Sequence, residues 1–305
     1  MVSSKTATQV ITSSVIENGE LVPAMKGNIK IETLNNWIEE ADGKIPAHVE
    51  HAIRTQRLLR IIVLSNYTDS FFYLLRHTPY YLSCGCLELW LQYGTGESQR
   101  MLPLHEISIT LGPAVSKVLV KAHILTGEDV MSKIGTKHAA YLMDPLKYLQ
   151  TFGENPRPSP AEIALVEEYL VRVYAGIRNK PIAKTFDELR LEKYVSGKVG
   201  INDLPPTSHT VHAHIHRGAF LIYKVCNLLN PDAHELDPTA YCFEKMFGIL
   251  VPMKSLNPLP ERMTKTCQCG GKCGDKRCQC VSCGRKCVLF CHKKSTGELC
   301  RNKIT

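Results

Sequence analysis

The sequence predicts an α/β protein in three parts: a parallel-sheet core, a mainly helical region and a small cysteine-rich zinc module. Three observations lead to this prediction. A strand, a helix and a second strand follow one another between residues 60 and 93, an order that builds a parallel sheet. Helical patterning dominates residues 145–229, and nine of the thirteen cysteines lie between Cys267 and Cys300.

The core is expected over residues 31–140, after a lead-in. Residues 1–30 have weak periodicity and many Ser, Thr and Gly, so we expect them to be poorly ordered. Gly43 and Pro46 interrupt the helical pattern, which predicts a helix only from Ala47 to about Leu58.

Regular elements then follow in quick succession. The apolar pattern predicts a buried strand at residues 60–65, a helix through 71–76 and a strand at 87–93. Two further helices are expected at 104–111 and 114–125.

The second half is expected to be mainly helical from residue 141 to 256. A helix over residues 160–177 is the clearest, and Thr207 or Ser208 is suited to cap a later one. The sequence Asn257-Pro258-Leu259-Pro260 predicts a linker that opens the last part, residues 257–305.

The apolar stretches of the sequence argue against a membrane protein. The longest, such as residues 60–65 and 87–91, fall far short of the roughly 20 residues needed to cross a bilayer. Residues 1–17 are polar and lack the apolar core of a signal peptide. We therefore expect a soluble intracellular protein without membrane partners.

The spacing of the terminal cysteines predicts zinc. Thiolates one to four residues apart, with Gly and Lys between them, can wrap around one tetrahedral ion. The Cys-x-Cys pairs are too close to serve separate fingers, which favours a cluster with bridging thiolates. A disulfide knot is the alternative, and the missing secretion signal argues against it. The expected ligands are Cys267, Cys269, Cys273, Cys278, Cys280, Cys283, Cys287, Cys291 and Cys300.

The positive charge of the chain is concentrated in the same segment. Residues 261–305 contain eleven Lys and Arg and three acidic residues, a net charge of +8 that equals the charge of the whole chain. Such a unit can neutralise phosphates and bind nucleic acid without reading its sequence. A solvated surface that binds nothing is the alternative. The expected nucleic-acid contacts in this segment are Lys272, Lys276, Arg277, Arg285 and Lys286.

This cysteine spacing, with its Cys300-Arg301-Asn302 ending, resembles the tesmin-type CXC domain. The resemblance implies a unit of about three zinc ions that binds DNA. Lys293 stands where the family repeats Cys-x-Cys, so Cys283 or His292 would complete the cluster. Arg277 stands where DNA-binding relatives carry an aromatic residue, and it could also enter a narrow minor groove.

Acidic residues at three places in the core are candidates for a divalent metal site. A two-metal nuclease needs carboxylates that converge on Mg²⁺ or Mn²⁺, and loops after parallel strands gather such groups. Taken singly, each acid is more simply a helix cap or a surface charge. The candidates are Glu40, Asp42, Asp69, Glu128 and Asp129.

A second resemblance covers residues 30–305. It rests on Glu39-Glu40-Ala41-Asp42, Ser65-Asn66-Tyr67-Thr68-Asp69, Leu104-His105-Glu106, Leu111-Gly112-Pro113, residues 123–129 and 132–137, Leu204-Pro205-Pro206-Thr207-Ser208 and the terminal module. Together these motifs resemble a group of uncharacterised animal proteins that look derived from mobile elements. Their core is similar to PIN-like and flap-endonuclease (XPG-type) nucleases.

The departures from that family imply an impaired enzyme. Tyr67 stands where the family has Asp, and residues 1–30 offer no candidate for its first-strand Asp, so the core looks truncated at its start. Fewer acidic ligands weaken Mg²⁺ binding. The segment from Lys133 to Lys137 resembles the loop with which flap nucleases hold duplex backbone, although a plain interhelical loop is an equal alternative.

Three functions follow as hypotheses. The first is a nuclear, zinc-containing, nucleic-acid-binding protein, most simply a DNA-binding one, with a degenerate nuclease core. The second is an active Mg²⁺- or Mn²⁺-dependent structure-specific nuclease. The third is a protein-interaction scaffold.

Overall fold

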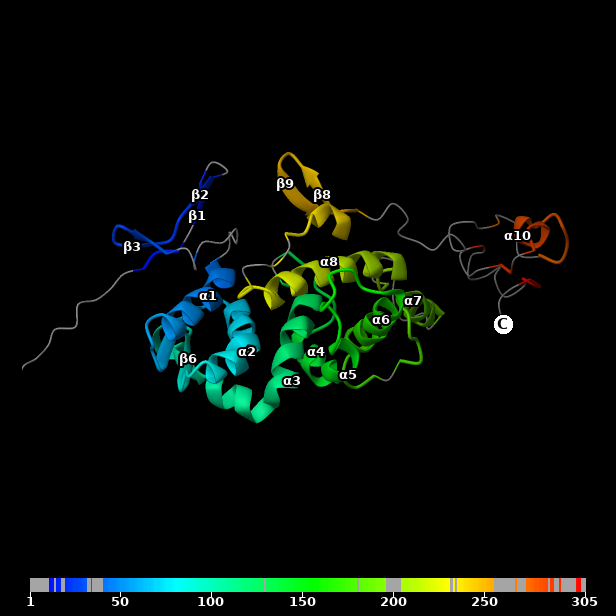
Figure 1. Ribbon diagram of the computed structural model, residues 1–305. Helices are drawn as coiled ribbons and strands as arrows, with labels where there is room; N and C mark the ends of the chain where they lie inside the picture. Colours follow the sequence, from blue (N-terminus) through cyan, green and yellow to red (C-terminus); the bar gives the residue numbers. More distant parts are fainter. Residues whose placement is uncertain are drawn as a thin grey trace, which may run out of the picture. The chain divides into compact units, whose positions relative to one another are not determined.

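The protein is described from a computed structural model, drawn in Figure 1. Its chain divides into two compact units. The first comprises Met1–Pro181 and His214–Pro252, and the second comprises Ile182–Ala213 and Met253–Thr305. The structure describes residues 11–13, 15–17, 20–31, 34, 41–128, 130–179, 181–195, 204–230, 233, 235–254, 267, 273–284, 286–287, 291 and 300–302.

Two short hairpins precede the core, where the sequence predicted little order. Strands β1 (Val15–Glu17) and β2 (Glu20–Val22) pair antiparallel, as do β3 (Met25–Lys26) and β4 (Ile29–Lys30). Asn18-Gly19, the dipeptide typical of a two-residue hairpin turn, separates the first pair in the sequence. The expectation was wrong for these strands, and residues 1–10 lie outside the described residues.

The first unit contains a three-stranded sheet. Strands β5 (Arg60–Leu64) and β6 (Glu88–Tyr93) are parallel, joined by helix α2 (Thr68–Ser83), which confirms the predicted strand, helix and strand. A short 3₁₀ helix, η2 (Gly96–Ser98), leads to β7 (Arg100–Pro103), which pairs antiparallel with β6. The fold is therefore mixed α/β, while its PIN-like character remains a prediction.

Helix α1 (Ala41–Arg54) begins earlier than the sequence predicted. Pro46 lies inside it, so the expected break was wrong. The helix packs against α2 and buries Val49 and Ile53 in a cluster that includes Tyr81. The Tyr81 hydroxyl donates to the Pro46 carbonyl at 2.9 Å, and this packing outweighs one lost helical hydrogen bond.

Helix α3 (Leu104–Leu125) contains the break that the sequence predicted. Gly112 has φ 78° and ψ 160°, so α3 is two helices joined at a kink. By length and composition α3 could cross a membrane, a weak indication because core helices pass the same test. Its second half, including Val118, Ile124 and Leu125, is buried and packs with α2.

The helices that follow confirm the predicted helical region. In the first unit these are α4 (Lys137–Leu142), α5 (Pro145–Leu149) and α6 (Pro160–Ala175), and packing continues across residue 140 because α3 contacts α5 and α4 contacts α6. The second unit contains α7 (Phe186–Val195) and the short α10 (Gln279–Ser282).

Helix α8 (Ser208–Cys226) follows Thr207, whose hydroxyl accepts from the Thr210 amide at 3.3 Å, as expected of a cap. A last hairpin, β8 (Phe243–Met246) and β9 (Ile249–Pro252), follows η4 (Pro238–Tyr241).

Candidate functional site

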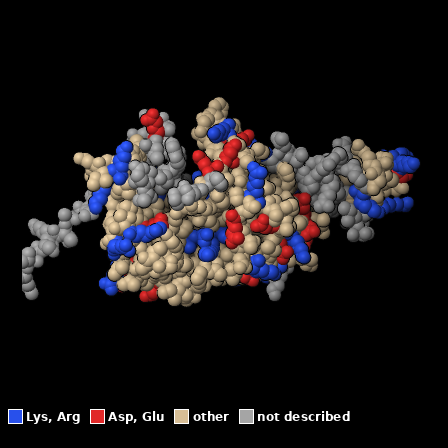
Figure 2. Space-filling model, viewed as in Figure 1, with Lys and Arg blue, Asp and Glu red and all other residues tan. Residues whose placement is uncertain are grey.

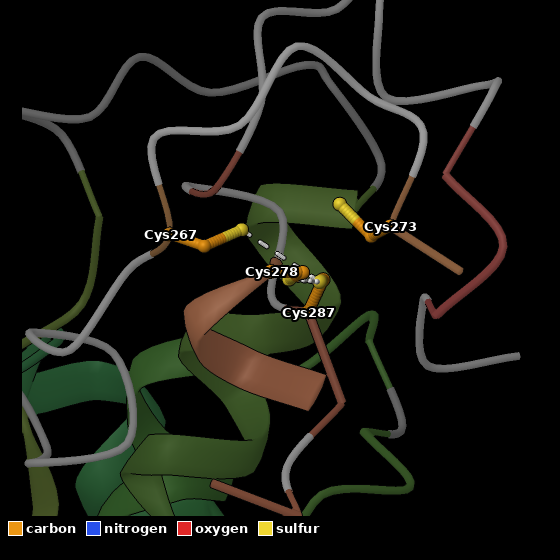
Figure 3. Close-up of side chains that lie close together, drawn as sticks. All are labelled: Cys267, Cys273, Cys278 and Cys287. Atoms are coloured by element: carbon orange, nitrogen blue, oxygen red, sulfur yellow. Dashed lines mark hydrogen bonds between the residues drawn. The ribbon is translucent and has the colours of Figure 1, made fainter. Parts of the chain in front are cut away.

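Seven of the eight described cysteines of the terminal module gather in one buried cluster. Figure 3 shows the Cys267, Cys278 and Cys287 side chains turned toward one another, with Cys273 beside them. The Sγ atoms of Cys267 and Cys287 are 3.8 Å apart, and those of Cys278 and Cys287 are 3.7 Å apart. Since α10 begins directly after Cys278, this short helix fixes the direction of that side chain.

Two groups of four cysteines in the cluster have the geometry of a metal site. One consists of Cys267, Cys273, Cys278 and Cys287, and the other of Cys267, Cys280, Cys287 and Cys291. In each group all four sulfurs lie within 4.8 Å of one another. The cluster can therefore hold a metal ion.

The sulfur separations also match a tetrahedron of thiolates. Zinc–sulfur bonds of about 2.3 Å place the corners of a tetrahedron about 3.8 Å apart. The Cys280 and Cys291 sulfurs, in the second group, are 3.7 Å apart. Disulfide sulfurs would be about 2 Å apart, and the described cysteines are free thiols. These residues contradict the disulfide alternative.

Cys267 and Cys287 belong to both groups, which makes their sulfurs candidates for bridging two ions. Asn302, whose role the sequence did not reveal, holds Cys287 from two sides. Its side-chain amide donates to the Cys287 sulfur at 3.4 Å, and its carbonyl accepts from the Cys287 amide at 2.7 Å. Metal ligands are commonly oriented by such outer hydrogen bonds.

The remaining cysteines fall into three cases. Cys300 is buried in the cluster. Cys283 is exposed and belongs to neither group, so the structure does not bring this predicted ligand to them. Cys269 and His292, the other candidate to complete the cluster, lie outside the described residues.

Burial raises the pKa of two of the clustered thiols, Cys280 and Cys287. It raises the pKa of Cys280 to about 12, and the neighbouring Cys291 and Cys267 sulfurs act in the same direction. A bound dication reverses this effect, because a coordinating thiol is deprotonated outright. The buried cluster therefore suits a cation that supplies the compensating charge.

Exposed cations lie on the surface of the described part of the module (Figure 2). Lys276, Arg277 and Lys286 are all exposed. Arg277 is already paired, because its guanidinium donates to the Asp275 carboxylate at 2.7 Å. Lys272 and Arg285, which the sequence also predicted as contacts, lie outside the described residues.

In the first unit, Asp69 is engaged by a histidine that the sequence analysis gave no role. His123 Nε2 lies 2.5 Å from Asp69 Oδ1, and His123 Nδ1 lies 2.9 Å from the Tyr141 hydroxyl. An ionised carboxylate only accepts, so we assign the proton to Nε2, and Tyr141 then donates to Nδ1. Burial lowers the pKa of His123 and so favours the neutral ring. The hydrogen bond to Asp69 acts in the opposite direction but is the smaller effect.

Lys137 and Glu128 lie at the same end of α3. The Lys137 amine donates to the His123 carbonyl, and the Tyr73 hydroxyl donates to Glu128. Burial lowers the pKa of Lys137 to about 8, while the charges of Asp69 and Glu128 act to raise it. The Lys137 side chain is thus directed toward the core carboxylates.

The loop before α4 requires a glycine at position 135 because of its backbone conformation and its close contact with α6. Gly135 has φ +64°, and a Cβ there would lie 2.7 Å from the Val173 carbonyl oxygen of α6. Thr136 caps α4 by accepting from the Ala139 amide at 3.2 Å. Lys133, the other predicted phosphate contact here, is exposed.

The carboxylates do not form a cation site among the described residues. The sets of three or more potential ligands found there are the two cysteine groups, and neither includes an acid. Mg²⁺ requires near-octahedral oxygen ligands at about 2.0–2.1 Å. The arrangement at Asp69 and Glu128 does not fit that requirement, because a histidine contacts one carboxylate and a tyrosine the other, while the nearby Lys137 amine binds the His123 carbonyl. Glu40 and Asp129 lie outside the described residues.

Asp42 lies elsewhere, in the first turn of α1. It lines a groove of about 590 Å³ together with Tyr67 and residues that follow β5 and β6. The groove occupies the carboxyl ends of the parallel pair, where the sequence predicted that acidic residues would gather.

Comparisons with protein families, curated proteins and solved structures find no match to this chain.

Proposed function

We propose that this protein is a zinc-containing nucleic-acid-binding protein, located in the nucleus, whose nuclease-like core does not cut. The observation that carries the proposal is the pair of four-cysteine groups sharing Cys267 and Cys287. Four thiolates in a tetrahedron are the ligand set of structural zinc sites.

The number of ions in the proposal is about three, as in the domain that the cysteine spacing resembles. Two groups account for six cysteines, since two of the eight positions are shared. Cys300 is buried in the same cluster and is available to a further ion with cysteines beyond the described residues.

Nucleic-acid binding follows from the charge of the module. Each phosphate neutralised by Lys or Arg releases counterions, so the logarithm of the binding constant falls with the logarithm of salt, by about 0.9 per phosphate on duplex DNA. Exposed side chains such as Lys276 and Lys286 are placed for such contacts. Arg277 would first have to leave Asp275.

Salt-dependent retention of duplex DNA by the full chain tests this part. Two charge reversals, Lys276→Glu and Lys286→Glu, should weaken retention. They should also reduce the slope of the logarithm of the binding constant against the logarithm of salt by the amount expected for about two lost phosphate contacts. Lys245→Glu on β8 is the matched control, because Lys245 is exposed in the other unit. If the control weakened retention as much as the module variants, or the wild type bound no nucleic acid, the scaffold alternative would be favoured.

The impaired core is supported by the side chains around Asp69 and Glu128. His123 and Tyr73 contact the two carboxylates as neutral hydrogen-bond partners, and the charged Lys137 amine lies close enough for both acids to act on its pKa. Cleavage assays on flap, hairpin and single-stranded DNA with Mg²⁺ or Mn²⁺ test it, and no cleavage is expected. Cleavage that disappears in both Asp69→Ala and Asp129→Ala would establish the active nuclease instead.

A further inference from the structure

A groove lies over the carboxyl ends of β5 and β6. Its lining comes from the first turns of α1, the segment from Leu64 to Tyr67, and the segment from Gln92 to Gln99. Its volume of about 590 Å³ falls within the range of about 300–1,000 Å³ usual for small-ligand sites. Ligands of open α/β sheets bind at this position.

The turn that carries Tyr67 is fixed by hydrogen bonds. The Ser65 hydroxyl accepts from the Tyr67 amide at 3.2 Å, and the Asn66 side-chain oxygen accepts from the Gly94 amide at 3.0 Å. Gly94 has φ +86°, and a Cβ there would lie 2.6 Å from the Ser98 carbonyl oxygen. These hydrogen bonds hold together the segments that follow β5 and β6. The Tyr67 side chain, which lines the groove, is 65% exposed.

The polar groups of the lining suit a neutral, flat ligand. Within the described part of the chain, the side-chain amides of Gln92 and Gln99 have no hydrogen-bond partner, so both can serve a ligand. Asp42 supplies a carboxylate, and the described lining contains no Lys or Arg. A phosphate would meet a negative charge there without a compensating cation.

We propose that this groove binds an unpaired nucleobase of the nucleic acid held by the protein. Tyr67 stacks on the base face, and Gln92 and Gln99 hydrogen-bond to its edge. Aromatic stacking tolerates any base, while side-chain amides favour adenine. The proposal rests on nucleic-acid binding as the function, and it gives a use to the tyrosine that stands where the resemblance expects an acid.

Free deoxynucleosides are the probe, because they carry the base without a phosphate. Saturation-transfer NMR on the full chain at high salt should show base protons in contact with the wild type. Tyr67→Phe should retain binding. Tyr67→Ala should weaken it by about 5- to 150-fold, the equivalent of about 1–3 kcal/mol of stacking. Phe247→Ala is the control, because Phe247 is 99% exposed on the β8–β9 hairpin and lies outside the groove.

A second variant keeps the test independent of Tyr67. Gln99→Ala should weaken deoxyadenosine more than thymidine. Equal binding by Tyr67→Ala and wild type, a loss in Phe247→Ala of the same size, or displacement of deoxyadenosine by inorganic phosphate with Mg²⁺ would each overturn the proposal. Duplex retention at low salt is measured in parallel, so failure of the groove and failure of the cationic module are separately visible.

Discussion

Substitution of Cys287 by serine should release more metal than substitution of any cysteine that belongs to one group only. The Cys287 sulfur is common to both four-cysteine groups, and it lies 3.8 Å from Cys267 and 3.7 Å from Cys278. Its loss leaves both groups with three thiolates. Cys287→Ser should therefore lose two metal ions per chain, whereas Cys273→Ser, which affects one group, should lose one.

Metal content per chain is measured by mass spectrometry after dialysis against a mild chelator. Cys283→Ser is the matched control, because Cys283 is exposed and belongs to neither group, and it should retain the wild-type content. Far-UV circular dichroism reports whether the core remains folded in each variant. Equal losses from Cys287→Ser and Cys273→Ser would refute the shared sulfur, and a loss in Cys283→Ser would make that residue the missing ligand.

Three further predictions concern the first unit. Lys137→Met should lower the thermal midpoint and create a stabilisation by Mg²⁺ that the wild type lacks, of about 1.4 kcal/mol if Mg²⁺ is present at about ten times its dissociation constant. The exposed Lys133→Met is the control, and Mg²⁺ stabilisation of the wild type would contradict the idea that the Lys137 amine opposes cation binding near Asp69 and Glu128. Burial lowers the pKa of His214 from its ordinary 6.5 to about 4. Between these values the unfolded chain binds a proton that the folded chain does not. The free energy of unfolding therefore decreases as the pH is lowered, by about 2 kcal/mol at pH 5. Chemical denaturation at pH 7 and pH 5 should show a smaller loss in His214→Asn than in wild type, and an equal loss would exclude this residue as the cause. Gly135→Ala should destabilise the protein by more than the roughly 1–2 kcal/mol of a left-handed backbone, because its Cβ would meet a carbonyl of α6, whereas Gly27→Ala, with φ +58° and open space, should show the backbone effect alone. Urea denaturation of both variants measures the difference, and equal effects would contradict the contact.

Local sequence signals were sufficient for the elements of the core. The apolar run at 60–65 becomes β5, and the pattern at 87–93 becomes β6, because neither run is interrupted by glycine or proline. The expected burial of the first strand was wrong, since Ile61 and Val63 are half-buried while Ile62 and Leu64 are 56% and 69% exposed. The break in α3 was also visible, since Gly112 precedes a proline and adopts φ 78°. These features depend on residues within a few positions of one another.

Tertiary contacts explain where the sequence predictions failed. Pro46 reads as a helix break, yet the hydroxyl of Tyr81, 35 positions away, binds its carbonyl and α1 continues through it. The contact of Asp69 with His123, 54 positions away, was likewise not visible in the sequence, and the role of Asp69 as a metal ligand stays a prediction. Nothing in the periodicity around either residue announces such a pair.

The cysteine module and the acidic core differ for the same reason. Thiolates in the module are close in sequence, so their spacing alone brings four of them around one point, and the prediction needed no knowledge of the fold. The core carboxylates come from separate elements, and their environment depends on which side chains the packing places between them. Lys137 is an example, because its amine binds the His123 carbonyl at the end of α3 and the charges of Asp69 and Glu128 act to raise its pKa. Under the proposed function, the cationic module attracts phosphate, and the groove beside Tyr67 binds the uncharged part of a nucleotide.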